Sequence, residues 1–137
     1  MSKLGPPMGD SLHTPTGNLA VLARLAFACA IAAITAAVFL PEKYVPGFLR
    51  SHYLEHFAAF YVLSFIGLAA APRARVRTLA MGIGLFITAL EGAHVMAGAN
   101  IPALIAHWAA DVGGVSAALA PVVLDRYRRG FAPAPPR

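Results

Sequence analysis

The sequence predicts an all-α integral membrane protein, a bundle of four transmembrane helices with both termini in the cytoplasm. Of its 137 residues, 58% are hydrophobic and only 12% are charged. Soluble domains carry about 25% charged residues, so a water-soluble globule of this composition would have too few charges to cover its surface. The chain also contains four apolar runs, each close to the roughly 20 residues that a helix needs to cross a bilayer.

The first predicted span covers residues 19–40. It follows a polar stretch at 1–18, which is rich in Pro, Gly, Ser and Thr and is expected to be a disordered tail. A cleaved signal peptide is the competing interpretation, because an A-x-A pattern surrounds Cys29. The apolar sequence continues well beyond that pattern, which favours an uncleaved span.

Proline marks the edges of the later spans. Pro72 ends the second run, and Pro102 suits the first position of the fourth helix. Within the fourth run, Gly114 and Ala118 are expected to let a neighbouring helix approach closely. The remaining elements are spans at 53–71, 78–96 and 102–124 and a basic, Pro-rich tail at 126–137, and the four spans form one transmembrane domain at 19–125.

The distribution of Lys and Arg predicts the orientation. If the N-terminus is inside, the outer loops hold only Lys43 and Arg50. An excess of basic residues on the cytoplasmic side is typical of membrane proteins, and it explains the net charge of +5 without a nucleic-acid partner. Nine basic residues would lie inside: Lys3, Arg24, Arg73, Arg75, Arg77, Arg126, Arg128, Arg129 and Arg137.

This orientation predicts that ionisable residues of three spans meet in the outer half of the bundle. His56 opens the second span at its outer end. Glu91 lies about two-thirds of the way across the outward-running third span, with His94 one turn further on the same face. His107 and Asp111 lie about 8 and 14 Å below the outer start of the fourth span. His52, Glu55 and Asn100 are expected at the periphery of this cluster.

Two interpretations of the cluster stay open. An unpaired carboxylate in hydrocarbon costs about 3 kcal/mol or more, so Glu91 and Asp111 are expected to face the bundle interior. In the first interpretation, the side chains serve only as polar contacts that fix helix packing. Alternatively, they form a site for a ligand, a proton or a metal ion.

No cofactor is the leading expectation, with a metal ion or haem as the alternative. Glu-x-x-His, the spacing of Glu91 and His94, occurs in di-metal helical bundles. The candidate metal ligands are therefore Glu91, His94, His107 and Asp111. Two histidines on facing helices would suit a haem, and the sequence does not choose between His94 with His107 and either of them with His56.

Short stretches around these residues form a wider pattern: Leu54 to Tyr61 opens the second span, Glu91 to His94 ends the third, and Asn100 to Gly114 leads into the fourth. This pattern resembles the VanZ-like family of small four-helix membrane proteins, over about residues 19–125. His56, Glu91 and Gly114 match the family motifs. The resemblance implies a multi-pass protein of the bacterial inner membrane and cell envelope.

The chain departs from the family at other polar positions. An Asp-Lys pair, a Gln, a loop Arg, an Asp and an Asn of the family are replaced, in that order, by His52 with Tyr53, His94, Asn100, His107 and Asp111. The loss of the Arg argues against a shared anionic lipid or glycolipid ligand. The gain of histidines favours the metal or cofactor alternative.

The leading functional hypothesis is a non-catalytic binding or accessory protein in the envelope membrane. Its expected partners are the lipid bilayer and an envelope lipid or partner helices. The alternatives are a metal- or haem-binding membrane protein and a small accessory subunit of a respiratory or photosynthetic complex. An enzyme is less favoured, because the sequence shows no nucleophile beside a base and no phosphate-binding loop.

Overall fold

The computed structural model describes residues 17–41, 44 and 47–131, and these contain four helices and no strand. Each helix is long and apolar enough to cross a membrane. The prediction of an all-α chain with four such helices is therefore confirmed. Of the tails predicted at 1–18 and 126–137, residues 1–16 and 132–137 lie outside the described residues. The helices are α1 (Asn18–Phe39), α2 (His52–Ala70), α3 (Val76–Met96) and α4 (Ile101–Gly130).

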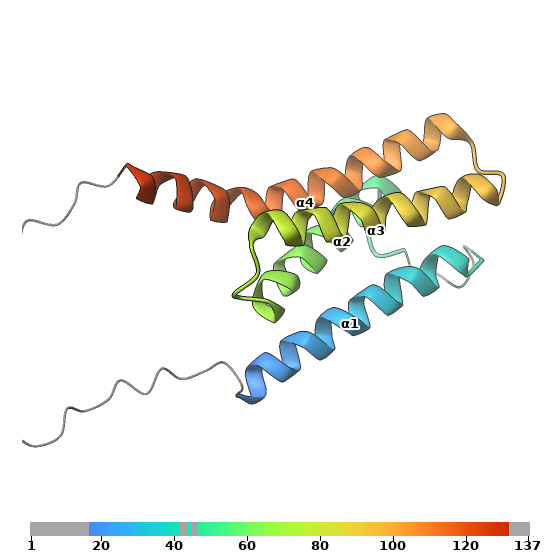
Figure 1. Ribbon diagram of the computed structural model, residues 1–137. Helices are drawn as coiled ribbons and strands as arrows, with labels where there is room; N and C mark the ends of the chain where they lie inside the picture. The colour runs from blue at the N-terminus through green and yellow to red at the C-terminus, as the bar shows by residue number, and fades with distance from the viewer. Residues whose placement is uncertain (1–16, 42–43, 45–46, 132–137) are drawn as a thin grey trace, which may run out of the picture.

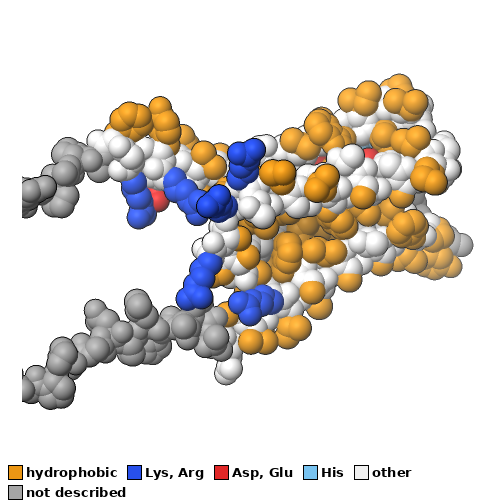
Figure 2. Space-filling view, viewed as in Figure 1, with side chains coloured by type: hydrophobic (Ala, Val, Ile, Leu, Met, Phe, Trp, Pro, Cys, Tyr) orange, Lys and Arg blue, Asp and Glu red, His pale blue; other side chains and the backbone are white. Residues whose placement is uncertain are grey.

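The helices alternate in direction along the bundle (Figure 1). The start of α1, the α2–α3 loop and the end of α4 lie at one end, where Lys and Arg side chains gather (Figure 2). We call this the arginine end; Arg24, Arg73, Arg75 and Arg77 belong to it. The opposite end carries the start of α2, the α3–α4 turn and the start of α4, and we call it the histidine end.

The core lies where α4 packs against α2, which is the most extensive helix pair, and against α3. At Gly114 the backbones of α2 and α4 approach so closely that a Cβ atom would overlap the carbonyl oxygen of Phe57. Ala118, one turn further, is also buried. The expectation that these two small residues face a neighbouring helix is confirmed. The buried apolar side chains of the core are Phe60, Leu63, Val76, Ile83, Ile87, Leu90, Val115 and Leu119.

The predicted end of the fourth helix was wrong. The helix continues past residue 124 to Gly130, so the basic residues at 126–130 are helical and do not belong to a tail. Arg is a good helix former, and basic side chains stabilise the negative end of the helix dipole. Asp125 and Arg129, one turn apart, also form an ion pair of 2.8 Å. The other helix bounds lie within two residues of the predicted ones.

Candidate functional site

The site is built on the close contact of α2 and α4. Asp111 lies one turn before Gly114, where the two backbones meet, so its side chain reaches α2 directly. Its carboxylate Oδ1 accepts a hydrogen bond from His56 Nδ1 at 2.9 Å. Asp111 is only 2% exposed, which makes this hydrogen bond the principal polar contact of a buried acid.

Three imidazoles surround this contact. His52 and His56 lie one turn apart on α2, and His107 lies one turn before Asp111 on α4. The ring centroids of His56 and His107 are 4.7 Å apart and their planes are inclined by only 13°. His52 packs edge-on against both rings, at 4.7 and 5.0 Å. One ring nitrogen of each histidine lies within 4.8 Å of the other two, and we call these residues the imidazole cluster.

A second group adjoins the first on its buried side. Glu91 of α3 is 4% exposed. One oxygen of Glu91, one oxygen of Asp111 and one ring nitrogen of His56 all lie within 4.8 Å of one another, and we call these residues the carboxylate cluster. Both acids face the interior, as their cost in hydrocarbon predicts. His56 belongs to both clusters and connects them.

His94 lies apart from the imidazoles. Its Nδ1 donates a hydrogen bond to Glu91 Oε2 at 3.3 Å, across one turn of α3. It belongs to neither of the two groups whose ligand atoms converge within 4.8 Å. Of the predicted metal ligands, Glu91 and Asp111 therefore meet in the carboxylate cluster, His107 lies in the imidazole cluster, and His94 bonds to Glu91 outside both ligand groups.

The three residues expected at the periphery of the cluster differ in their contacts with it. His52 lies within the imidazole cluster, in ring contact with its two other members. Glu55 lies between the cluster and the preceding loop, and its Oε1 accepts a hydrogen bond from the backbone N–H of Leu49 at 2.8 Å. Its Oε2 lies 3.5 Å from His52 Nδ1. Asn100 is exposed and precedes α4 without a side-chain capping bond.

One signal for His52 was present in the sequence. His52 and His56 have the i,i+4 spacing that places two imidazoles on one helix face, as in helical zinc sites. The intervening Glu55 completes an H-x-x-E-H pattern, which in metallopeptidases supplies a catalytic acid. The contact of Glu55 with Leu49 directs one carboxylate oxygen to the loop, whereas the two imidazoles of the pattern are in ring contact with each other.

The donor set suits a transition-metal ion better than the other ligands considered. Imidazole nitrogen is the preferred ligand of zinc, copper, iron and nickel. The near-parallel stacking of His56 and His107 leaves no room for a haem between these two rings, and His94, the third predicted haem ligand, bonds to Glu91 instead of facing either ring. An anionic head group would meet the carboxylates of Glu91 and Asp111, and among the described residues no Arg or Lys bonds to either cluster.

No family model, no curated protein and no solved structure matches the chain. The resemblance to the VanZ-like family therefore stays a prediction from short motifs. The function is argued below from the two clusters and from the placement of charge along the bundle.

Proposed function

We propose that the protein is a non-catalytic, multi-pass protein of the bacterial cell-envelope membrane that binds a divalent transition-metal ion. The ligands are the imidazoles of His52, His56 and His107. The observation that carries this proposal is the convergence of their ring nitrogens within 4.8 Å, from two helices held together at Gly114. Three imidazole ligands leave a fourth position for water or a further ligand, as in known three-histidine zinc sites.

The contact with Asp111 supports a ligand role for His56. When Nδ1–H donates to a carboxylate, the proton is fixed on that nitrogen and Nε2 is left with its lone pair free to bind a metal. Asp111 is the partner in this bond, at 2.9 Å. Glu91 adds a second negative charge close to the site, and this charge would partly neutralise a divalent cation.

The placement of the site supports binding in preference to catalysis. The side chain of His52 is 57% exposed, so an ion can enter the imidazole cluster from the surface. The acid next to His56 in the sequence, Glu55, is engaged at both oxygens, by the backbone N–H of Leu49 at Oε1 and by His52 Nδ1 at 3.5 Å from Oε2, so neither oxygen is free to act as a base. A site with this access and no such base suits the capture or holding of an ion.

The location rests on charge and on resemblance. Basic residues gather at the arginine end, and positive charge is typically retained in the cytoplasm. We therefore place both termini in the cytoplasm and the histidine end toward the outside of the inner membrane. The motifs shared with the VanZ-like family support a place in the cell envelope.

Metal analysis of the purified protein tests the proposal. The full chain in mild detergent is stripped with a chelator, dialysed against Zn²⁺ or Cu²⁺ and freed of unbound ions, and its metal content is measured by elemental analysis. We expect one ion per chain in the wild type and none in His56→Ala. His94→Ala is the matched control, since it also removes a half-buried histidine of the same end, and it should retain the ion. Equal metal content in wild type and His56→Ala would overturn the assignment.

A further inference from the structure

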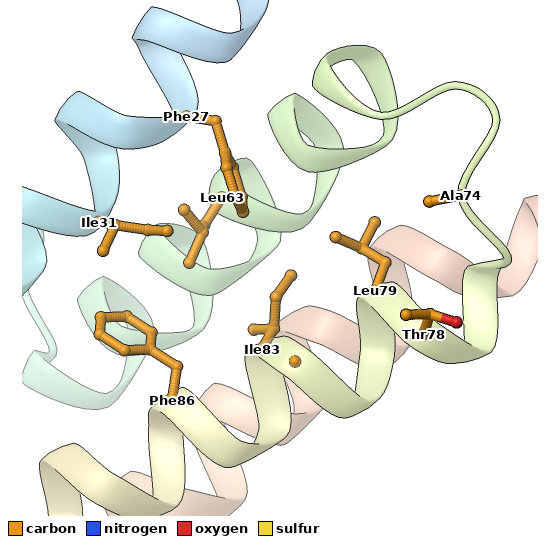
Figure 3. A pocket seen from close by; sticks show the side chains of 9 residues that line it. Phe27, Ile31, Leu63, Ala74, Thr78, Leu79, Ile83 and Phe86 are labelled. Atoms are coloured by element: carbon orange, nitrogen blue, oxygen red, sulfur yellow. The ribbon is translucent and has the colours of Figure 1, made fainter.

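An apolar groove lies between α1 and α3, far from the histidines. Its volume is about 300 Å³, the lower end of the range of small-molecule pockets. Figure 3 shows the side chains of α1 and α3 pointing toward each other across it, with Leu63 of α2 behind them. The helices α1 and α3 make few contacts with each other, which leaves the groove open along its length. The apolar side chains that define it are Phe27, Ile31, Leu63, Leu79, Ile83 and Phe86.

One wall of the groove has free space at a glycine. Gly82 of α3 lines the groove, and a Cβ atom built on it would meet no atom within 4 Å. In a bilayer this groove faces hydrocarbon, so its occupant must be apolar and flexible. An acyl chain has both properties.

Cations stand at one mouth of the groove. The groove extends to Ala74 and Thr78, around the α2–α3 loop at the arginine end. Arg73 and Arg75 flank Ala74, and Arg77 precedes Thr78. All three arginines are exposed, and none takes part in an ion pair among the described residues.

A fourth cation comes from the other wall. Arg24 lies one turn before Phe27 on α1, and its Nε donates to the carbonyl oxygen of Ala70 at 3.4 Å. This bond holds the guanidinium between α1 and the end of α2, beside the loop that carries Arg73. The mouth of the groove is thus flanked by positive charge from both α1 and the loop.

We propose that the groove binds an anionic phospholipid of the leaflet at the arginine end. One acyl chain lies between α1 and α3, and the phosphate is bound by Arg73 and Arg75, with Arg24 and Arg77 nearby. The charge of the mouth decides the occupant, because guanidinium groups bind phosphate by paired, charge-assisted hydrogen bonds. Basic pockets between transmembrane helices on the cytoplasmic side bind such head groups in other proteins. This proposal does not depend on the metal site.

Native mass spectrometry of the full chain tests it. The protein in mild detergent is mixed with equal amounts of phosphatidylglycerol and phosphatidylcholine that carry the same acyl chains. We expect the wild type to retain phosphatidylglycerol preferentially. The double substitution Arg73→Gln and Arg75→Gln should reduce this preference by roughly fivefold per arginine, the effect of one basic residue at an anionic membrane surface.

A matched pair of variants tests the groove itself. Gly82→Leu adds a side chain to the groove wall at a position where a Cβ atom meets nothing within 4 Å, and it should lower the retention of both lipids. Gly84→Leu is the control, because a Cβ at Gly84 also meets nothing within 4 Å, yet Gly84 does not line the groove. Leu is a better helix former than Gly, so both variants should keep their helical circular dichroism.

Three results would overturn the proposal. One is equal retention of the two lipids by the wild type. Another is equal lipid retention in Gly82→Leu and Gly84→Leu. The third is a wild-type dimer that Gly82→Leu disrupts and Gly84→Leu does not, since the occupant of the groove would then be a second copy of the chain.

Discussion

His56 and Asp111 lie 2.9 Å apart, from Nδ1 to Oδ1, across the interface of α2 and α4. The bond crosses the most extensive helix contact of the bundle. It also belongs to both polar clusters, because His56 is a member of each. A buried carboxylate that loses its partner is costly, so the bond fixes the relative rotation of the two helices as well as the orientation of one imidazole. The predictions below follow from this arrangement.

Asp111→Asn should weaken metal binding by about 10- to 100-fold, the usual effect of removing a carboxylate that orients a ligating histidine. The amide has nearly the same shape, but it lacks the charge that holds the Nδ1 proton of His56. Calorimetric titration of the stripped protein with Zn²⁺ measures the change. Asp125→Asn is the control, since Asp125 pairs with Arg129 at the arginine end, away from both clusters. Wild-type affinity in Asp111→Asn would show that the carboxylate has no part in the site.

His52→Gln and His94→Gln should separate the two possible ligand sets. His52 lies in the imidazole cluster, whereas His94 bonds to Glu91 and belongs to neither ligand group. His52→Gln removes a ligand itself, so we expect it to weaken metal binding at least as much as the loss of a residue that orients a ligand, which costs about 10- to 100-fold. His94→Gln should bind nearly as the wild type does. If the same titrations show that His94→Gln loses affinity and His52→Gln does not, then His94 is a ligand and His52 is not.

Gly114→Ala should destabilise the bundle by about 1–3 kcal/mol, the usual cost of overpacking. Its new Cβ would overlap the carbonyl oxygen of Phe57, which is backbone and cannot rotate away. Thermal unfolding in detergent, followed by circular dichroism, gives the shift. Gly92→Ala is the control, because a Cβ at Gly92 in α3 meets nothing within 4 Å. An unchanged midpoint in Gly114→Ala would mean that α2 and α4 are further apart than described.

The burial of the two acids was predictable from the sequence, because the cost of a carboxylate in hydrocarbon depends on composition and depth alone. Glu91 and Asp111 are accordingly 4% and 2% exposed. The meeting of three helices in one layer also followed from their alternating directions. Which histidines share that layer did not follow, because it depends on the rotation of each helix about its axis.

That rotation is set by packing contacts that a single sequence does not display. The close contact at Gly114 fixes the relative rotation of α2 and α4, and this rotation turns His56 and His107 toward each other. His94 instead bonds to Glu91 of its own helix, α3. The groove beside Gly82 could not be predicted from the sequence either. It exists because α1 packs mainly on α2 and leaves α3 partly uncovered. The i,i+4 spacing of His52 and His56 was the one overlooked signal that needed no knowledge of packing.

The orientation of the bundle can be tested through its single cysteine. With Cys29→Ala as a background that carries no thiol, Asn100→Cys places one thiol in the α3–α4 turn and Ala71→Cys places one beside the α2–α3 loop. Both positions are exposed. We expect a membrane-impermeant maleimide to label Asn100→Cys in intact cells and Ala71→Cys only after permeabilisation, because the excess of basic residues predicts that the arginine end stays inside. The opposite labelling would place the imidazole cluster in the cytoplasm, and metal would then have to enter the site from that side.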